Sequence, residues 1–424
     1  MKKIKIDEIA RRAKDSSRKL ALASTDAKNA ALDLIADELI AKSGRIIAEN
    51  RKDVSEARKK GLSGALIDRL VMTEKTIRDI AKGVRDIAAL PDPVGEVLSE
   101  WRTPSGMRIK KVKVPLGVVG MIYESRPNVT VDSSALCLKS SNAIILRGGK
   151  EAINSNRILV RVIKDALEKS GRPSEIPQEI IQFIDDTDRR RVYEMVRQDA
   201  LIDLIIPRGG EEMIKKIRRE ATVPVLAHGK GVCHTYIDTD ASADMAIKVS
   251  YNAKVQRPGV CNAMETLLVH RDIAEKVLPQ LARAYAAANV EIRGCPETLK
   301  ILPHVPHVKK ATKDDWPAEY LDLILSVKVV GSTQEAIEHI NKYGSGHSDA
   351  IITDDEKTAG EFIKGVDSAA VFHNASTRLH DGGVFGLGAE IGISTQKLHA
   401  RGTMGVRELT TTKYIVTGTG QVRE

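Results

Sequence analysis

The sequence predicts an α/β protein with two mostly parallel sheets, and three observations support this prediction. From residue 118 onward, short apolar runs alternate with amphipathic helical segments. Such alternation is typical of parallel strands that are joined by helices. The chain has 424 residues, enough for about two or three domains, and 42% of them are apolar, enough for sizeable cores. Two sheets joined near residue 231 are the simplest account of the pattern.

The first 90 residues are predicted to be helical. Within residues 25–44, apolar side chains recur at every third or fourth position. Thr25 or Asp26 is suited to cap the start of this helix, and Gly44 is suited to end it. The stretch LPDPVGEV, residues 90–97, then interrupts the helical pattern.

Strands and helices follow in alternation. Residues 108–122 first alternate between polar and apolar side chains and then become continuously apolar, which predicts an exposed strand leading into a buried one. Further strands are expected at residues 142–150, 200–210, 232–238, 264–270, 321–330 and 348–355, with helices at 156–171, 211–221, 274–290 and 333–344. The β-prone tail, residues 407–420, is expected to form either an edge hairpin with the early strand or a flap for a neighbouring subunit.

The charge balance favours small anionic ligands over nucleic acid. The net charge of +9 arises from 66 basic and 57 acidic residues that are mixed along the chain. Aromatic residues make up only 3% of the chain, too few for a platform on which bases stack. Phosphates and other anionic small molecules suit this composition better.

The cysteines and the chain start indicate the cytoplasm. The basic start lacks the apolar run of a signal peptide, and no stretch is long enough to cross a membrane. Of the four cysteines, Cys137 and Cys233 lie in apolar surroundings and are expected in the core, and Cys295 is expected in an exposed turn. No two cysteines have zinc-ligand spacing, so no metal is expected.

Two predicted strands end in Gly-Gly beside a basic residue, at residues 147–150 and 207–210. Ligands bind at the carboxyl ends of parallel strands, and glycine lets the backbone approach a phosphate closely. Each turn by itself is typical of an ordinary strand-to-helix connection, whereas two in one domain, each with an arginine, indicate a nucleotide site and an ordinary connection equally. Neither turn is a Walker A or GxGxxG motif, so both interpretations stay open at this point.

Cys261 has an unusual setting for a core cysteine. It follows Pro258 and Gly259 in a predicted turn, with Arg257 four residues before it and Asn262 after it. A thiol is a nucleophile only as thiolate, and a nearby cation lowers its pKa from about 8.5. Cys261 is therefore a candidate nucleophile, the alternative being a turn cysteine whose neighbour Asn262 is simply a turn former. The ten histidines are dispersed, so a Cys-His hydrolase is not indicated.

Several blocks resemble the γ-glutamyl phosphate reductase family of the aldehyde dehydrogenase superfamily. They run in order over nearly the whole chain: VPLGVVGMIYESRPNVTVD, ILRGGKE, LIIPRGG, NAKVQRPGVCNAMETLLV, NASTR, DGGVFGLGAEIGISTQKLHARG and ELTTTKY. The resemblance implies an aldehyde dehydrogenase-like α/β fold with two Rossmann-like parallel-sheet domains and a small β oligomerisation flap. It also implies NADPH-dependent reduction of L-glutamyl 5-phosphate to L-glutamate 5-semialdehyde in proline synthesis, by a cytoplasmic homo-oligomer that glutamate 5-kinase supplies with substrate.

The resemblance implies domain boundaries as well. The NADP-binding domain is expected over residues 1–99 and 118–230. The catalytic domain, with Cys261, is expected over residues 231–404, its C-terminal part returning toward the cofactor domain. Residues 100–117 and 405–424 are expected to be the oligomerisation segments.

Roles are implied residue by residue. Cys261 matches the family's nucleophile, and Asn128 matches the asparagine that binds the oxyanion together with the N–H of the cysteine. Glu319 matches the glutamate that holds the nicotinamide ribose. The remaining residues expected to bind the cofactor are Ser125, Arg147, Lys150, Arg208, Gly209 and Gly210. Those expected to bind the carboxylate and phosphate of the substrate are Arg257, Arg378 and Arg401.

Departures from the superfamily pattern refine the reaction. Leu226 stands where hydrolytic members have the glutamate that activates water, so a thioester on this chain should survive until it is reduced. Arg147 and Lys150 stand where a lysine and a ribose-binding glutamate are usual, which predicts a preference for NADPH over NADH. Leu379, His380 and Thr403 also differ from the usual family residues. If their loops contact the substrate, the resemblance predicts the reaction type better than it predicts the affinity for the substrate.

Two other functions fit parts of the sequence. A CoA-acylating aldehyde dehydrogenase would also lack the water-activating glutamate. A nucleotide-binding scaffold without chemistry would have an unreactive Cys261. The scarcity of aromatic residues weighs against a third alternative, a basic RNA-binding protein.

Overall fold

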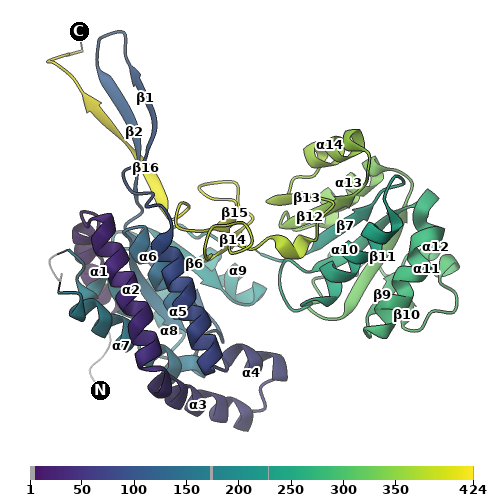
Figure 1. Ribbon diagram of the computed structural model, residues 1–424, viewed down its shortest axis with the longest axis horizontal. Helices are drawn as coiled ribbons and strands as arrows, with labels where there is room; N and C mark the ends of the chain where they lie inside the picture. The colour runs from purple at the N-terminus through teal and green to yellow at the C-terminus, as the bar shows by residue number, and fades with distance from the viewer. Residues whose placement is uncertain (1–4, 172–174, 228, 424) are drawn as a thin grey trace. The chain divides into compact units, whose positions relative to one another are not determined.

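Two separate parallel sheets organise the chain in the computed structural model, which describes residues 5–171, 175–227 and 229–423. Unit 1 comprises residues 1–227, 386–392 and 403–424, and unit 2 comprises residues 228–385 and 393–402. Figure 1 labels helices and strands of both units. The predicted fold class is confirmed, whereas the cofactor-binding and catalytic roles of the predicted domains stay predictions.

Unit 1 contains a four-stranded sheet in the order β5-β4-β3-β6, and all its strand pairs are parallel. Every residue of β3 and β4 is buried, as expected for apolar strands covered on both faces. The strands are β3 (Val118–Tyr123), β4 (Ala143–Gly148), β5 (Ile181–Phe183) and β6 (Leu204–Arg208).

Helices pack on this sheet and on one another, as Figure 1 shows for the purple and teal parts of the chain. They are α1 (Ile6–Leu20), α2 (Thr25–Ala41), α3 (Ser43–Lys59), α4 (Gly64–Leu70), α5 (Glu74–Ala89), α6 (Asn128–Lys139), α7 (Ile153–Lys169), α8 (Arg190–Met195) and α9 (Glu211–Glu220), with the short 3₁₀ helices η1 (Lys150–Ala152) and η2 (Gln178–Ile180).

The predicted ends of α2 were wrong. Ser24 is the N-cap, because its hydroxyl oxygen accepts a hydrogen bond from the Ala27 N–H at 3.2 Å. The helix ends before Lys42, and Gly44 lies inside α3. The break between α2 and α3 therefore falls at Lys42, and no glycine marks it in the sequence.

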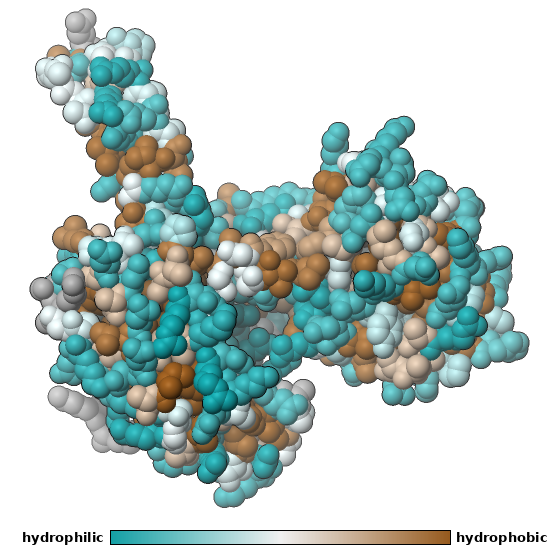
Figure 2. Space-filling model, viewed as in Figure 1, coloured by the Kyte–Doolittle hydropathy of each residue, from teal (hydrophilic) through white to brown (hydrophobic). Residues whose placement is uncertain are grey.

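A three-stranded antiparallel sheet extends from unit 1: β1 (Val97–Arg102), β2 (Arg108–Pro115) and β16 (Thr410–Thr417). It joins the predicted early strand to the predicted β-prone tail. Figure 2 shows hydrophobic side chains gathered on it. The exposed apolar residues on these strands are Val97, Leu98, Trp101, Tyr414, Ile415 and Val416. Such a surface supports the predicted oligomerisation flap, which stays a prediction.

Unit 2 is built on a seven-stranded parallel sheet in the order β10-β9-β11-β8-β7-β12-β13. Neighbouring residues of β8 serve opposite faces, since Leu267 and Leu268 belong to separate core clusters. The strands are β7 (Cys233–Ile237), β8 (Met264–His270), β9 (Glu291–Gly294), β10 (Val308–Lys310), β11 (Ile324–Val330), β12 (Ser348–Ile352) and β13 (Ala370–His373).

The helices of unit 2 are α10 (Ala243–Val255), α11 (Arg271–Ala287), α12 (Pro296–Ile301), α13 (Thr333–Tyr343) and α14 (Glu356–Gly365), with η3 (Thr377–Leu379). Two short strands, β14 (Gly392–Ser394) and β15 (Gly402–Met404), pair where the chain passes between the units. Cys295 was predicted to be exposed, but it is buried. Its sulfur lies 3.3 Å from the Thr298 hydroxyl at the start of α12.

Two absences hold for the part of the chain that the structure describes. There, no helix has the length and apolar character needed to span a bilayer. Within the same residues, no cluster of three or more histidine, cysteine or acidic side chains is arranged to hold a metal ion.

Candidate active site

The sheet of unit 1 presents three strand ends at one edge. Tyr123, the last residue of β3, is the register partner of Gly148 in β4 and of Arg208 in β6. Because these strands are parallel, the turns that follow them lie together. A cavity of about 500 Å³ opens beside these turns and is bounded further by the loop before α8 and by α9. Open α/β sheets bind their ligands at such an edge.

Four cations line this cavity: Arg147, Lys150, Arg189 and Lys216. Arg147 is buried, and its guanidinium donates hydrogen bonds to the carbonyls of Gly148 at 2.5 Å and Thr187 at 3.0 Å. Burial lowers the pKa of Arg147, while the charges of Glu151 and Asp186 act in the opposite direction. Arg147 thus forms part of the wall, whereas Lys150 is exposed at the start of η1.

Ser125 is engaged by the acidic neighbour of Lys150. The Glu151 carboxylate accepts hydrogen bonds from the Ser125 N–H at 2.6 Å and from its hydroxyl at 2.9 Å. Ser125 has a φ of +41°, an uncommon backbone conformation for serine that these two bonds help to hold. Glu151 lines the cavity together with Glu124 and Glu212, so anions lie next to the cations. The Glu151 carboxylate is committed to the turn after β3.

The Pro-Arg-Gly-Gly turn connects β6 to the N-terminus of α9. The Gly210 N–H donates to the Glu124 carboxylate at 3.3 Å, so a negative group already lies at this helix end. A side chain at Gly209 would come within 2.2 Å of the Met213 methyl group and 2.8 Å of the same carboxylate oxygen, so both of these side chains would have to move. Arg208 is half-buried and donates to the Ile391 carbonyl at 3.3 Å.

Asn128 is the first residue of α6. Its side-chain amide donates to the Asp132 carboxylate at 2.9 Å, one helical turn along. Burial raises the pKa of Asp132 to about 6, although the Asn128 hydrogen bond and the charge of Arg208 act in the opposite direction. An asparagine amide has two N–H groups, so one stays available while Asp132 fixes the orientation of the other.

Cys261 lies in the turn between α10 and β8 of unit 2 and is half-buried. The Cys233 thiol donates to the Cys261 carbonyl at 3.2 Å, and burial raises the pKa of Cys233 well above its usual range. A side chain at Gly231 would come within 2.0 Å of the same carbonyl oxygen. Close packing of β7 thus fixes the backbone of the turn.

Arg378 borders the Cys261 turn. It donates to the Asn262 side chain and, at 2.9 and 3.1 Å, to Gln256, while the Asn262 amide donates to the His380 carbonyl at 3.0 Å. Burial and the charge of exposed Arg257 lower the pKa of Arg378, and a Cys261 thiolate acts in the opposite direction. The predicted residue Arg378 is therefore within electrostatic range of both Arg257 and Cys261.

Two further predicted residues are found at different places in unit 2. The Glu319 carboxylate accepts a hydrogen bond at 2.7 Å from the N–H of Gly231, the residue packed on Cys261. Arg401 instead forms an ion pair with Asp367 at 2.8 Å and donates to the Asp367 carbonyl at 2.8 Å. These contacts commit much of the Arg401 guanidinium to a structural partner.

Sequence reasoning missed the polar groups behind Cys261. The Ser348 hydroxyl lies 2.7 Å from the Nδ1 atoms of both His347 and His380, and all three side chains are buried. Lys254 and Glu265 form a fully buried ion pair at 2.6 Å. Glu265 is a charged residue within the apolar run METLLVH, and a buried charge requires a partner. This run was therefore a signal in the sequence for the Lys254–Glu265 pair.

The chain is similar to known proteins along its whole length. A sequence model described as the aldehyde dehydrogenase family matches residues 1–315. The γ-glutamyl phosphate reductase of Thermodesulfovibrio yellowstonii is 54% identical over 415 residues, which cover 98% of each chain. That of Carboxydothermus hydrogenoformans is 55% identical with the same coverage. A crystal structure of γ-glutamyl phosphate reductase from Thermotoga maritima matches with a TM-score of 0.95 and 48% identity, covering 99% of this chain and all of that one.

Proposed function

The chain belongs to the aldehyde dehydrogenase family, in its γ-glutamyl phosphate reductase branch, and on that premise we propose its reaction and the residues that carry it. The protein is an oxidoreductase that acts on an aldehyde group. It reduces L-glutamyl 5-phosphate to L-glutamate 5-semialdehyde and releases phosphate, the second step of proline synthesis from glutamate. The observation that carries this proposal is 54% identity over 98% of the chain to a relative named for that reaction.

Cys261 is the proposed nucleophile. Its thiolate attacks the acyl carbon of glutamyl phosphate, and phosphate leaves to give a thioester. The Cys261 N–H and the available amide N–H of Asn128 are assigned to the developing oxyanion, a type of interaction whose donors contribute about 3 kcal/mol each. Collapse of the reduced hemithioacetal then releases the aldehyde and restores the thiolate.

The thioester must persist until it is reduced. Leu226, at the position of the water-activating glutamate in hydrolytic relatives, is buried and has no group that can take a proton. Its side chain supports a reductase rather than a hydrolytic dehydrogenase.

The cavity of unit 1 suits a nicotinamide cofactor, which the family uses. It lies at the carboxyl ends of parallel strands, and its Lys150, Arg189 and Lys216 are exposed cations suited to phosphate. Arg147 shapes the wall, Ser125 and the turn of Arg208, Gly209 and Gly210 form the adjacent edge, and Glu319 is assigned to the nicotinamide ribose. When bound, NADPH supplies the hydride that reduces the thioester.

Arg257 and Arg378 are the proposed partners of the substrate's phosphate and carboxylate, because Arg257 lies in the Cys261 turn and Arg378 of η3 borders it. Arg401 is a weaker candidate, since Asp367 already pairs with it. The proposal includes a homo-oligomer formed through β1, β2 and β16, with substrate supplied by glutamate 5-kinase. It also includes a cytoplasmic location, which fits the absence of disulfides among the four cysteines, all of them within the described residues.

A reverse assay tests the reaction. The protein is given glutamate 5-semialdehyde and NADP⁺ with phosphate, with CoA, or with neither, and NADPH absorbance is followed. We expect NADPH formation that requires phosphate. Formation with CoA but not phosphate would replace the proposal with the CoA-acylating alternative, and cofactor binding without any turnover would favour the scaffold.

A further inference from the structure

The segment between β10 and β11 carries Glu319 and is held at both ends. Glu319 reaches the Gly231 N–H at 2.7 Å, and Gly231 packs on the carbonyl of Cys261. The position of this segment therefore decides where the Glu319 carboxylate lies relative to the nucleophile. Both anchors of the segment consist of buried carboxylates.

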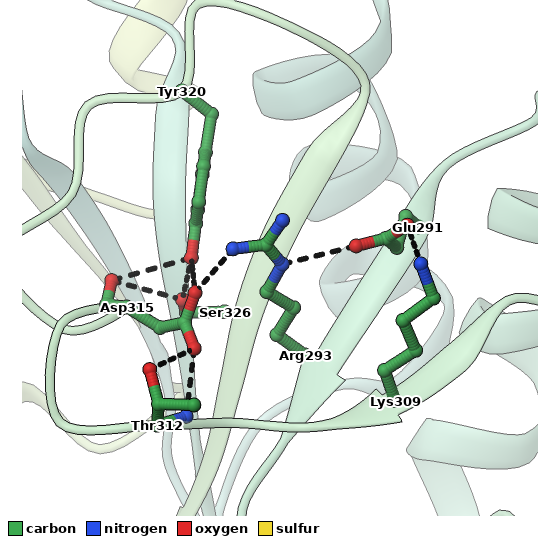
Figure 3. Close-up of polar contacts among 7 residues, drawn as sticks. All are labelled: Glu291, Arg293, Lys309, Thr312, Asp315, Tyr320 and Ser326. Carbon is green, nitrogen blue, oxygen red and sulfur yellow. Dashed lines mark hydrogen bonds and ion pairs between the residues drawn. The ribbon is translucent and has the colours of Figure 1, made fainter.

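Asp315 is the first anchor, shown in Figure 3. Its carboxylate accepts hydrogen bonds from Arg293 at 2.5 Å, from the Thr312 N–H at 2.7 Å and from the Tyr320 hydroxyl at 2.9 Å. The Tyr320 hydroxyl also lies 2.8 Å from that of Ser326 in β11. Burial alone would raise the pKa of Asp315, but the hydrogen bonds from Arg293 and Thr312 lower this pKa to about 2.

Glu265 is the second anchor, and it lies only four residues after Cys261. One carboxylate oxygen pairs with Lys254 at 2.6 Å, and the other accepts the Leu321 N–H at 3.0 Å. Leu321 has a φ of +53°, a left-handed conformation that leucine rarely adopts, although its side chain is 44% exposed. Packing of the partly exposed Leu321 side chain does not account for the left-handed backbone conformation. The hydrogen bond from the Leu321 N–H to Glu265 does.

A buried ion pair needs a reason beyond stability. Removing two charges from water costs roughly as much as their attraction returns, and apolar residues of similar size often stabilise a protein equally well. The Lys254–Glu265 pair leaves no carboxylate oxygen of Glu265 unused, because the second oxygen holds the backbone of Leu321. The strand that begins beside the nucleophile thereby also fixes the segment of Glu319.

We infer that Glu265 is a positioning residue: held by Lys254, it keeps Leu321 in its left-handed conformation and so sets Glu319 for the cofactor. This inference rests on the proposed function, in which Glu319 contacts the nicotinamide ribose. Lys254 acts through Glu265, and Asp315 supports the same segment from its other end.

The test is a double-mutant cycle between Glu265→Gln and Glu319→Gln. Each single change is expected to lower kcat/KM for NADP⁺ in the reverse assay by roughly tenfold to a hundredfold, the effect of misplacing a group by about 1 Å. The double variant should be little worse than Glu319→Gln, because both changes remove the same contact. The KM for the semialdehyde is expected to be unchanged. Independent, multiplying losses, or a wild-type kcat/KM in Glu265→Gln, would overturn the inference.

Glu335→Gln is the matched control. Glu335 also pairs with a lysine, Lys328 at 2.9 Å, and also accepts a backbone N–H, that of Gly331 at 2.8 Å, but it does not hold the Glu319 segment. Its kinetics are expected to match the wild type. The Glu335 side chain is 41% exposed, whereas that of Glu265 is fully buried. An equal loss in this variant would show that the effect of Glu265→Gln is a general one of removing a carboxylate that pairs with a lysine and accepts a backbone N–H.

Leu321→Pro tests the same point if Glu265→Gln does not fold. Proline lacks the N–H and has a φ near −65°, so it removes both features that Glu265 holds while leaving the ion pair intact. We expect the same loss and the same non-additivity with Glu319→Gln.

NADPH affinity, measured by the fluorescence of NADPH in all variants, does not require turnover. A failed reverse assay with normal NADPH binding would therefore count against the proposed reaction, and a wild-type affinity and kcat/KM in Leu321→Pro would count against the positioning role.

Discussion

Arg378 donates a hydrogen bond from its guanidinium to the side chain of Asn262, the residue that directly follows Cys261. The same guanidinium holds Gln256 on the other side of the turn. These contacts use three of the five N–H donors of an arginine and leave two for a ligand. A single side chain from η3 thus links both ends of the nucleophile's turn and can still bind an anion.

Arg378→Ala is expected to raise the KM for phosphate or the semialdehyde in the reverse assay. A charge-assisted hydrogen bond contributes about 1.5–3 kcal/mol, or roughly ten- to a hundredfold. Arg401→Ala is the comparison, because Arg401 is paired with Asp367 and should change KM less. An unchanged KM in Arg378→Ala would remove this residue from the substrate site.

Cys261→Ala and Cys261→Ser are expected to abolish turnover while leaving NADPH binding and the unfolding curve near those of the wild type. The reason is that the thiol forms the covalent intermediate but is only half-buried, so its loss leaves little cavity. Cys137→Ala, which alters a buried thiol of unit 1, should keep activity in the folded protein. More than a few per cent of activity in Cys261→Ala would contradict the mechanism.

Asn128→Ala is expected to lower kcat by about 10²–10³ with a smaller effect on KM, because an oxyanion donor acts mainly in the transition state. Steady-state kinetics of the reverse reaction measure this, with circular dichroism as the check on folding. Asp132→Asn is the informative companion, since it keeps the shape of the Asn128 partner but removes its charge. If kcat in Asn128→Ala equals that of the wild type, Asn128 is not part of the site.

Lys150→Glu is expected to lower the efficiency with NADPH by at least about tenfold while NADH use changes little or improves, because one charge-assisted bond to the 2′-phosphate becomes a repulsion. The measurement is kcat/KM with each cofactor. Lys75→Glu makes the same charge change at an exposed residue of α5 in unit 1 and should affect neither cofactor selectively. An equal response of both cofactors to Lys150→Glu would mean that Lys150 does not distinguish them.

His380 is expected to make stability depend on pH. Burial lowers the pKa of His380 from 6.5 to about 4. Between these values the unfolded chain binds a proton that the folded chain does not, so the free energy of unfolding decreases as the pH falls from 6.5 to 4. The decrease is up to about 1.4 kcal/mol per pH unit.

Urea unfolding of the wild type and His380→Thr at several pH values isolates this contribution, because other titrating groups are common to both. The threonine side chain does not titrate, so the free energy of unfolding of this variant should fall less steeply as the pH decreases. His304→Thr, at an exposed histidine, should follow the wild type. Parallel curves for the wild type and His380→Thr would contradict a buried neutral His380.

Local patterns in the sequence were sufficient for the fold class and for the identity of the candidate groups. Period-two and continuous apolar runs depend on neighbours along the chain, so they predicted β2, β3, β4 and β6 of unit 1 and β7, β8, β11 and β12 of unit 2. The short strands β9, β10 and β13 were not predicted. Cys261 stood out because a turn with Pro258 and Gly259 is an odd place for a core thiol. The roles of Asn128 and Glu319 came only from resemblance to a family, since nothing in their local sequence indicates them.

Tertiary structure decided everything that depends on distant partners. It buried Cys295, which local sequence placed in an exposed turn. It added Arg189 and Lys216 to the cavity beside Lys150, although α8 and α9 are far from η1 in sequence. It also paired Lys254 with Glu265 and attached Leu321 to the same carboxylate. The sequence by itself specifies which side chains can hold a charge or donate a proton, but only packing determines which of them meet, because burial and distance set the strength of every such interaction.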